Sequence, residues 1–153
     1  MRDLITAKIC EEVATLPDIT VYQERYEKFR TEELPAMTVK AQGDDAQKNK
    51  PENVLRRTEK IVIEIYTTGQ ELQQNAESGF VKISSKIQAF VKEVEGKLVK
   101  DRNTLGGLVD GENEFFRLEY RGAVIGELPD TGEDLMMIAV MSFDGVWDNV
   151  LQP

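Results

Sequence analysis

The chain has 153 residues, with 28 acidic against 19 basic side chains and a formal net charge of −9. This length fits a single domain, residues 1–153, that buries a hydrophobic core. The negative charge excludes a protein that grips duplex nucleic acid through a broad basic surface.

The rare residue types narrow the function further. The chain has no histidine, which excludes Ser-His-Asp and Cys-His catalysis and most zinc sites. Its one cysteine, Cys10, excludes an intramolecular disulfide and suits a reducing compartment. No apolar run approaches the roughly 20 residues that span a bilayer, and acidic residues interrupt the N-terminal segment, so we expect a cytoplasmic protein with no signal peptide and no membrane partner.

The first predicted element is a helix over 3–16, capped by Asp3 and ended by Pro17. Its apolar face repeats at spacings of four, four and three residues, which is helical periodicity. The face comprises Ile5, Ile9, Val13 and Leu16. Cys10 lies beside this face, and with no base to activate it we expect a buried structural thiol, not a nucleophile.

Three strands are predicted next, over 19–23, 36–41 and 54–68. In the third, Ile61, Ile63 and Ile65 share one face, and β-branched side chains dominate. Glu64 lies among these isoleucines, and we expect a partly covered carboxylate or a cross-strand pair with Lys40.

The segment "AQGDDAQKNKPEN" separates the second and third of these strands. It is almost entirely polar and has no turn dipeptide at its centre. Loops of this length are usually functional or disordered. We therefore predict a mobile loop over about residues 42–54 that becomes ordered against a neighbouring molecule.

A long amphipathic helix is predicted over 69–100. Its apolar stripe steps by three or four residues and is more typical of a helix packed on a sheet than of a coiled coil. The stripe comprises Leu72, Ala76, Phe80, Ile83, Ile87, Phe90, Val94 and Leu98. The glycines and carboxylates of 101–113 fit neither a phosphate-binding loop nor an EF-hand, so a solvated turn is expected.

The last elements are a strand over 114–128, interrupted at Gly122 or Gly126, and a central strand over 135–143. Phe116, Leu118 and Tyr120 are expected on one face of the first. The C-terminal tail, 144–153, carries Trp147, which docks on its own domain or meets a neighbour. The order predicts an α+β fold: a mostly antiparallel four- to five-stranded sheet packed on one long helix and an N-terminal helix.

No catalytic constellation emerges from this pattern. Acidic pairs arise by chance among 28 carboxylates, and the polar loop offers no desolvated setting for a catalytic acid. We predict a protein that is not an enzyme, has no cofactor and works through its surfaces.

Two local patterns carry a resemblance to a known family. "FRTEELPAMTVK" precedes the polar loop, and "EKIVIEIYTT" follows it and leads into the long helix. Together with the order of elements, over roughly 4–143, they resemble the tail terminator proteins of long-tailed phages, the minor tail protein U family of lambda-like phages and prophages. Each pattern describes a strand and not an invariant chemical site.

The resemblance implies a structural subunit of the virion tail, assembled in the bacterial host cytoplasm. Such terminators form a ring, typically of six subunits, that caps the tail tube, stops its polymerisation and presents a surface to the head–tail connector protein. DNA passes through the lumen, where acidic walls would let it slide. Another head–tail joining or neck protein, and a non-phage binding module or Mg²⁺-dependent enzyme, are the alternatives.

Ring subunits need complementary patches for their head-to-tail contacts. The placement of charge predicts that Arg56 and Arg57 of one subunit contact Asp44 and Asp45 of the next. A solvated charge cluster with no partner explains the same pattern. The candidate interface also includes nearby cations and the tail aromatic. These are Lys48, Lys50 and Trp147.

Overall fold

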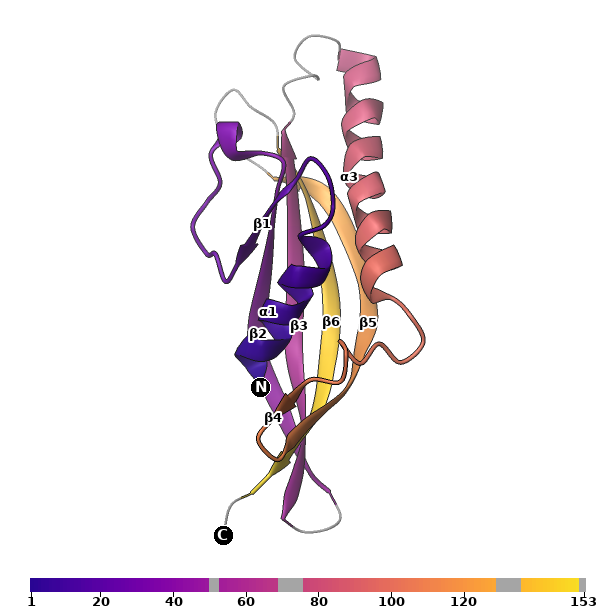
Figure 1. The fold of residues 1–153 in the computed structure, drawn as a ribbon. Helices are drawn as coiled ribbons and strands as arrows, with labels where there is room; N and C mark the ends of the chain where they lie inside the picture. Colours follow the sequence, from indigo (N-terminus) through magenta and orange to yellow (C-terminus); the bar gives the residue numbers. More distant parts are fainter. Residues whose placement is uncertain (50–52, 69–75, 129–135, 152–153) are drawn as a thin grey trace.

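The protein is built on one long, curled sheet with two helices against one of its faces (Figure 1). The computed structural model describes residues 1–49, 53–68, 76–128 and 136–151. The six strands lie in the order β1-β2-β3-β6-β5-β4. Their bounds are β1 Thr20–Gln23, β2 Ala36–Asn49, β3 Val54–Thr68, β4 Val109–Asp110, β5 Asn113–Leu128 and β6 Met136–Val150.

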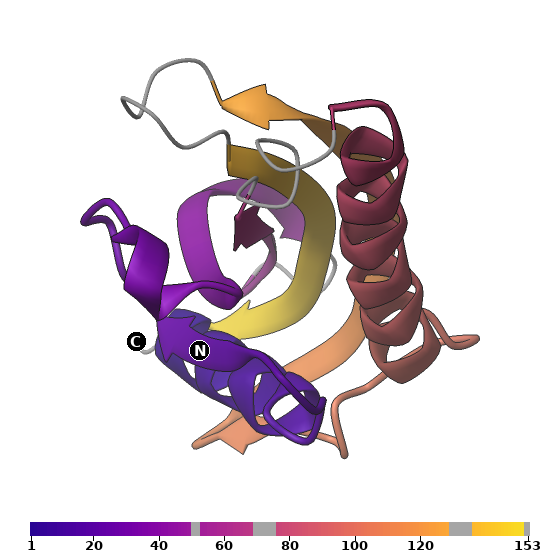
Figure 2. The same cartoon turned by 90° about the horizontal axis from the view of Figure 1, so that it is seen from above.

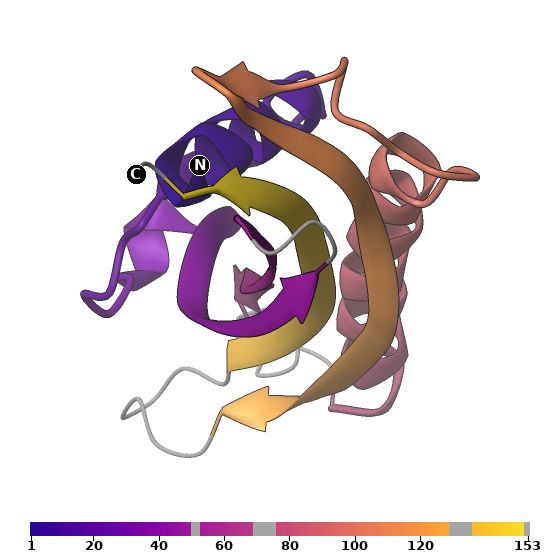
Figure 3. The ribbon, with the colours of Figure 1, turned by 90° about the horizontal axis from the view of Figure 1, so that it is seen from below.

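Two α-helices, α1 (Arg2–Val13) and α3 (Ala76–Leu98), cover the sheet, and a short 3-10 helix, η1 (Thr31–Glu33), precedes β2. Helix α1 packs on β1 and β2, whereas α3 packs on β3, β6 and β5. Viewed along the strands, the sheet curls and both helices lie outside the curl (Figures 2 and 3). One face of the sheet is therefore covered by the two helices, and no described helix lies on the other, which we call the open face.

The predicted fold class was wrong. The sheet has six strands instead of four to five, and it is mixed because β1 runs parallel to β2. Long strands, and not the long helix, dominate the molecule. The strand predicted over 19–23 is β1, but the two residues of β4 are too short to show a period in the sequence, and β2 extends well past its apolar part.

The predicted mobile loop over 42–54 was also wrong in most of its length. Residues up to Asn49 belong to β2, and Val54 already begins β3. The two strands pair from Gly43 opposite Lys60 to Asn49 opposite Val54. The segment is polar because it is an exposed part of a strand, where water covers the side chains and apolar alternation is not required. Residues 50–52 lie outside the described part of the chain.

The core lies between the helices and the sheet, as the apolar periodicities predicted. Ile5, Ile9 and Val13 of α1 are fully buried, and so are the three isoleucines of β3. From α3, Ile87, Val94 and Leu98 join them; the side chains of 69–84 lie outside the described part. The predicted central strand is β6, which lies between β3 and β5.

A bulge changes the predicted faces of β5. The register shifts between Phe115 and Arg117, so Phe115 and Leu118 are buried while Phe116 is exposed. One extra residue reverses the alternation, which is why Phe116 and Leu118 do not share a face. A second bulge between Tyr120 and Gly122 takes the place of the predicted break, and the strand continues through it.

The C-terminal segment completes the sheet. Residues up to Val150 form the end of β6, and Trp147 is buried against its own domain. Gly145 lies under α1, where an added Cβ would stand 3.5 Å from Ile5 Cδ1 and 3.5 Å from Phe115 Cε2. Close approach of the helix to the strand at this point requires a small residue.

Candidate interaction surface

The charged residues predicted for the interface lie on β2 and β3, in the part of the sheet that extends beyond α3 toward the β2–β3 hairpin (Figure 1). Consecutive strand residues point to opposite faces, so Arg56 and Arg57 cannot form one patch. Arg56 and Lys60 lie on the open face, and Arg57 lies with Glu59 on the face that α1 covers. The structure thus divides the predicted charge cluster into two groups.

The open-face group is a chain of ion pairs that crosses the sheet from β2 to β5. Asp144 of β6 is its centre: it accepts hydrogen bonds from Lys60 Nζ at 3.2 Å and from Arg121 Nε at 2.7 Å. Arg121 also donates to Glu119 at 2.8 Å, and Arg117 donates to Glu119 at 2.5 Å. Asp45 stands at the β2 end, 4.0 Å from Lys60. The chain joins four strands through side chains on one face.

Arg56 forms a separate two-pronged pair on the same face. Its Nε and Nη2 donate to the two carboxylate oxygens of Asp148, at 3.0 and 3.3 Å. The guanidinium also lies 4.4 Å from the centre of the Phe116 ring, the residue that the β5 bulge exposes. Arginine suits this position because its planar group both stacks and bonds bidentately. Arg56 therefore fastens β3 to β6 and shields an exposed aromatic ring.

The second group lies beside the start of α1. Arg57 donates to Asp44 at 2.7 Å, and Trp147 Nε1 donates to Glu59 Oε1 at 3.3 Å. Glu59 is only 5% exposed. Burial raises the pKa of the Glu59 carboxyl, and the hydrogen bond from Trp147 opposes this in part. Glu59 is thus a buried acid with one described side-chain donor.

The two predicted arginines and Asp44 are paired within the chain, which lowers their availability to a neighbour. Asp45 is the exception, because it is 77% exposed and its one ion pair among the described side chains is the long contact to Lys60. Trp147 is buried in its own domain and is not exposed to a neighbouring molecule. Lys48 lies in β2 with its side chain outside the described part, and Lys50 lies outside it altogether.

Sequence reasoning missed most of the network. The signal was present in β5, where Arg117, Glu119 and Arg121 alternate in sign at every second residue and so share a face of a strand. The partners on β6 come from far away in sequence, and no local pattern links Lys60 to Asp144. The predicted pair of Lys40 and Glu64 is confirmed, at 2.5 Å.

Both edges of the sheet are partly free. Strand β1 covers β2 only over Ala36–Val39, and Glu24 caps the edge as far as Ala41. Strand β4 and Asn103 cover β5 only as far as Leu118. Among the described strands, none pairs with the outer side of 42–49 in β2 or of 119–128 in β5. Unpaired strand edges present backbone donors and acceptors to any chain that meets them.

Other kinds of site find little support in the described ranges. No group of three or more potential metal-ligating side chains comes together there. Cys10 is half-buried, points its thiol at the Tyr22 carbonyl at 3.9 Å, and has its pKa raised to about 11, mainly by burial. The thiol is therefore protonated at neutral pH, as expected of a structural cysteine. No described helix is both long and apolar enough to cross a membrane.

Comparison with known proteins gives a structural likeness but no sequence family. No family model and no curated protein sequence matches the chain. Among solved structures, the fold is similar to that of a chain in the virion of a native gene transfer agent particle, with a TM-score of 0.50. That alignment covers 92% of this chain and 84% of the other at 14% sequence identity, so it speaks to the fold alone.

Proposed function

We propose that this chain is a structural protein of a phage-like virion tail and that it acts as a tail terminator. The observation that carries the proposal is the likeness of almost the whole fold to a chain of the gene transfer agent virion. The patterns at 29–40 and 59–68 support the terminator role by resemblance. In this role the chain forms a ring on the finished tail tube, stops its growth and offers a surface to the head–tail connector.

The open face of the sheet is the natural lining of such a ring, because the helices lie outside the curl (Figure 3). Along the ion-pair chain and the Arg56–Asp148 pair, this face holds four cations against four carboxylates. A balanced, mutually paired surface offers DNA phosphates few unpaired cations, and so it would let DNA pass through. In this proposal the weak affinity for DNA comes from the pairing of the surface charges more than from the net negative charge of the chain.

The test is electron microscopy of the purified chain mixed with tail tubes formed by its cognate tube protein. We expect rings at one end of each tube and an arrest of further tube growth when free tube protein is added. Tubes incubated without the chain are the control. Tubes that keep growing, with no added density at their ends, would contradict the terminator role. Rings that bind connector but never tube would favour a neck protein.

A further inference from the structure

We propose that the free edge of β2 in one copy pairs, antiparallel, with the free edge of β5 in a second copy. The two stretches are 42–49 and 119–128, and they lie at opposite edges of one sheet. This contact deepens the proposed function, since it rests on a ring of identical subunits and names the surface that builds it.

Strand directions permit the contact. Strand β2 is antiparallel to β3, β3 to β6, and β6 to β5. Three reversals make β2 and β5 antiparallel within one copy. Copies related by rotation about an axis to which the strands are tilted keep these directions, so a neighbour's β2, displaced along the strands, meets β5 in the antiparallel sense. The six-stranded sheets would then join into one continuous sheet, with the helices of every copy on the same side.

Charge is complementary where the two edges meet. Asp45 lies on the free part of β2, is 77% exposed, and has a single described cation at 4.0 Å. Arg121 begins the free part of β5 on the same face and is 56% exposed. In the proposed contact, the exposed Asp45 carboxylate of one copy approaches the half-exposed Arg121 guanidinium of the next. The chain of ion pairs then continues from one copy into its neighbour.

Charge disfavours one form of the alternative contact between identical edges. Two β2 edges that met antiparallel with Asp44 and Asp45 at the centre would bring these acids of both copies together. Like charges opposite one another on paired strands are destabilising. A contact between different edges is heterologous, which generates rings or filaments instead of closed dimers. The edge charges therefore favour head-to-tail assembly.

The first test is pairwise cross-linking of two singly substituted proteins, each with Cys10→Ser. One carries Gln47→Cys, which lies with Asp45 on the open face and leaves its carboxylate in place. The other carries Val124→Cys, which is 73% exposed on the same face of β5. The two differ in mass and are joined by a short bis-maleimide, whose span tolerates a register difference of about two residues at roughly 3.4 Å each. We expect the heterodimer to exceed both homodimers by at least about tenfold. A statistical mixture, an excess of homodimers or no product would overturn the proposal.

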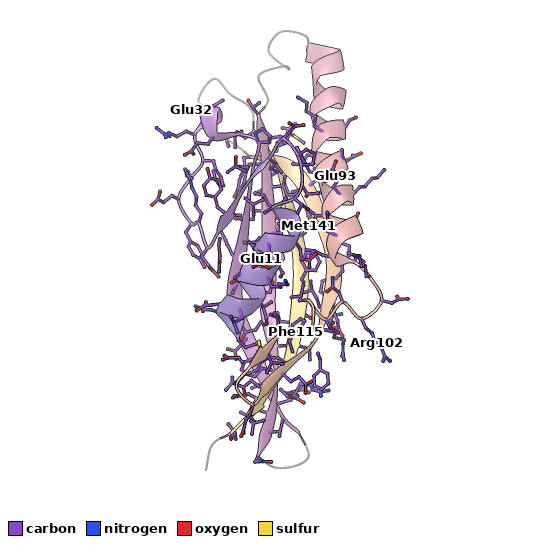
Figure 4. The ribbon with its side chains drawn as sticks, viewed as in Figure 1. Glu11, Glu32, Glu93, Arg102, Phe115 and Met141 are labelled. Atoms are coloured by element: carbon purple, nitrogen blue, oxygen red, sulfur yellow. The ribbon has the colours of Figure 1, made fainter. Side chains whose placement is uncertain are left out.

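A matched control measures how much cross-linking random collision produces. Glu93→Cys puts an exposed thiol on α3, on the helix side of the sheet (Figure 4). Mixed with the Gln47→Cys protein, it should give no preferred heterodimer. A preference equal to that of the Val124→Cys protein would also overturn the proposal.

Charge reversal gives the second test. Asp45→Lys, added to the Gln47→Cys protein, should lower heterodimer yield roughly tenfold, because it sets a cation against Arg121. Glu93→Lys makes the same change of charge on α3 and should leave the yield unchanged. Equal yields for the two variants would overturn the role of Asp45. We expect both variants to unfold as the unsubstituted protein does, because Asp45 and Glu93 are exposed. Matching unfolding curves would exclude a folding defect.

The outcome separates this contact from the proposed function. Selective cross-linking without any capping of tubes would support the edge contact and contradict the terminator role. Capping of tubes by rings whose subunits give only statistical cross-linking would do the reverse.

Discussion

The two faces of the sheet are stabilised in different ways, although every long strand contributes to both. The face under α1 and α3 is filled by isoleucine, methionine and phenylalanine, which are almost all fully buried. The open face near the hairpin end is joined by ion pairs whose cations are between about one-third and one-half exposed. Apolar burial does not depend on a partner, whereas charged groups in water contribute little to stability and stay available for recognition. The covered face therefore maintains the fold, and the open face and its edges are suited to assembly.

The largest expected effect is the loss of a side chain from the covered face. Ile63 is fully buried at the centre of the sheet. Ile63→Ala should lower the free energy of unfolding by about 2–5 kcal/mol through lost transfer energy and the cavity that remains. Val124→Ala on the open face, at 73% exposure, should change it by less than about 0.5 kcal/mol. Chemical denaturation measures both, and equal losses would end the distinction between the faces.

Overpacking the covered face is the next largest change. Gly145→Val places branched methyl groups against Ile5 and Phe115, so we expect a loss of about 1–3 kcal/mol. Gly145→Ala adds only a Cβ at ordinary contact distance, and it should be nearly neutral. Thermal unfolding of the two variants compares them directly. A valine variant as stable as the alanine variant would show that α1 adjusts its position freely.

On the open face, the most sensitive residue is Asp144. It is 5% exposed and accepts from both Lys60 and Arg121. Asp144→Asn should lower stability by about 1–2 kcal/mol, because charge-assisted hydrogen bonds weaken. Raising the salt concentration should narrow the difference from the unsubstituted protein, since screening weakens exposed ion pairs. An unchanged difference at high salt would mean that the loss comes from packing.

The smallest expected effect concerns the buried acid Glu59. Its raised pKa means that the folded state favours the neutral carboxyl, so ionisation at higher pH costs stability. Glu59→Gln should stabilise the protein at pH 7 by up to about 1 kcal/mol. The gain should shrink as the pH falls toward the ordinary carboxyl value of 4.5, where Glu59 is neutral as well. Free energies of unfolding between pH 4 and 8 measure this, and a gain that is independent of pH would contradict it.

Elements with a strong apolar period were predictable from the sequence. The N-terminal helix and the isoleucine strand emerged from periodicity, because each has a buried face that must repeat at the local geometry. The central strand emerged from its apolar residues on both faces. The second half of β2 was not predictable, since it has no buried apolar face and resembles a loop in composition. Its strand character comes from pairing with β3, a tertiary effect that propensity does not record.

The charged surface was predictable only in part. The sequence placed Asp44 and Asp45 near Arg56 and Arg57. The structure pairs Arg57 with Asp44, but it puts Arg56 on the opposite face, where Arg56 pairs with Asp148. The sequence could not say which arginine pairs with which carboxylate, because the bulge at Ala41–Gly43 sets which side chains of β2 face those of β3. The β6 partners depend on pairing across about ninety residues of chain.

The offset between the two free edges has a geometric consequence. Gly43, Lys60, Asp144 and Glu119 lie on one row across the sheet, and the free part of β2 runs from this row toward one end while that of β5 runs toward the other. Two copies that satisfy both edges are therefore displaced along the strands. A closed barrel absorbs such a displacement as shear, by tilting every strand against the ring axis. Without that tilt the displacement accumulates from copy to copy, and the same contact winds into a helix whose pitch the offset fixes.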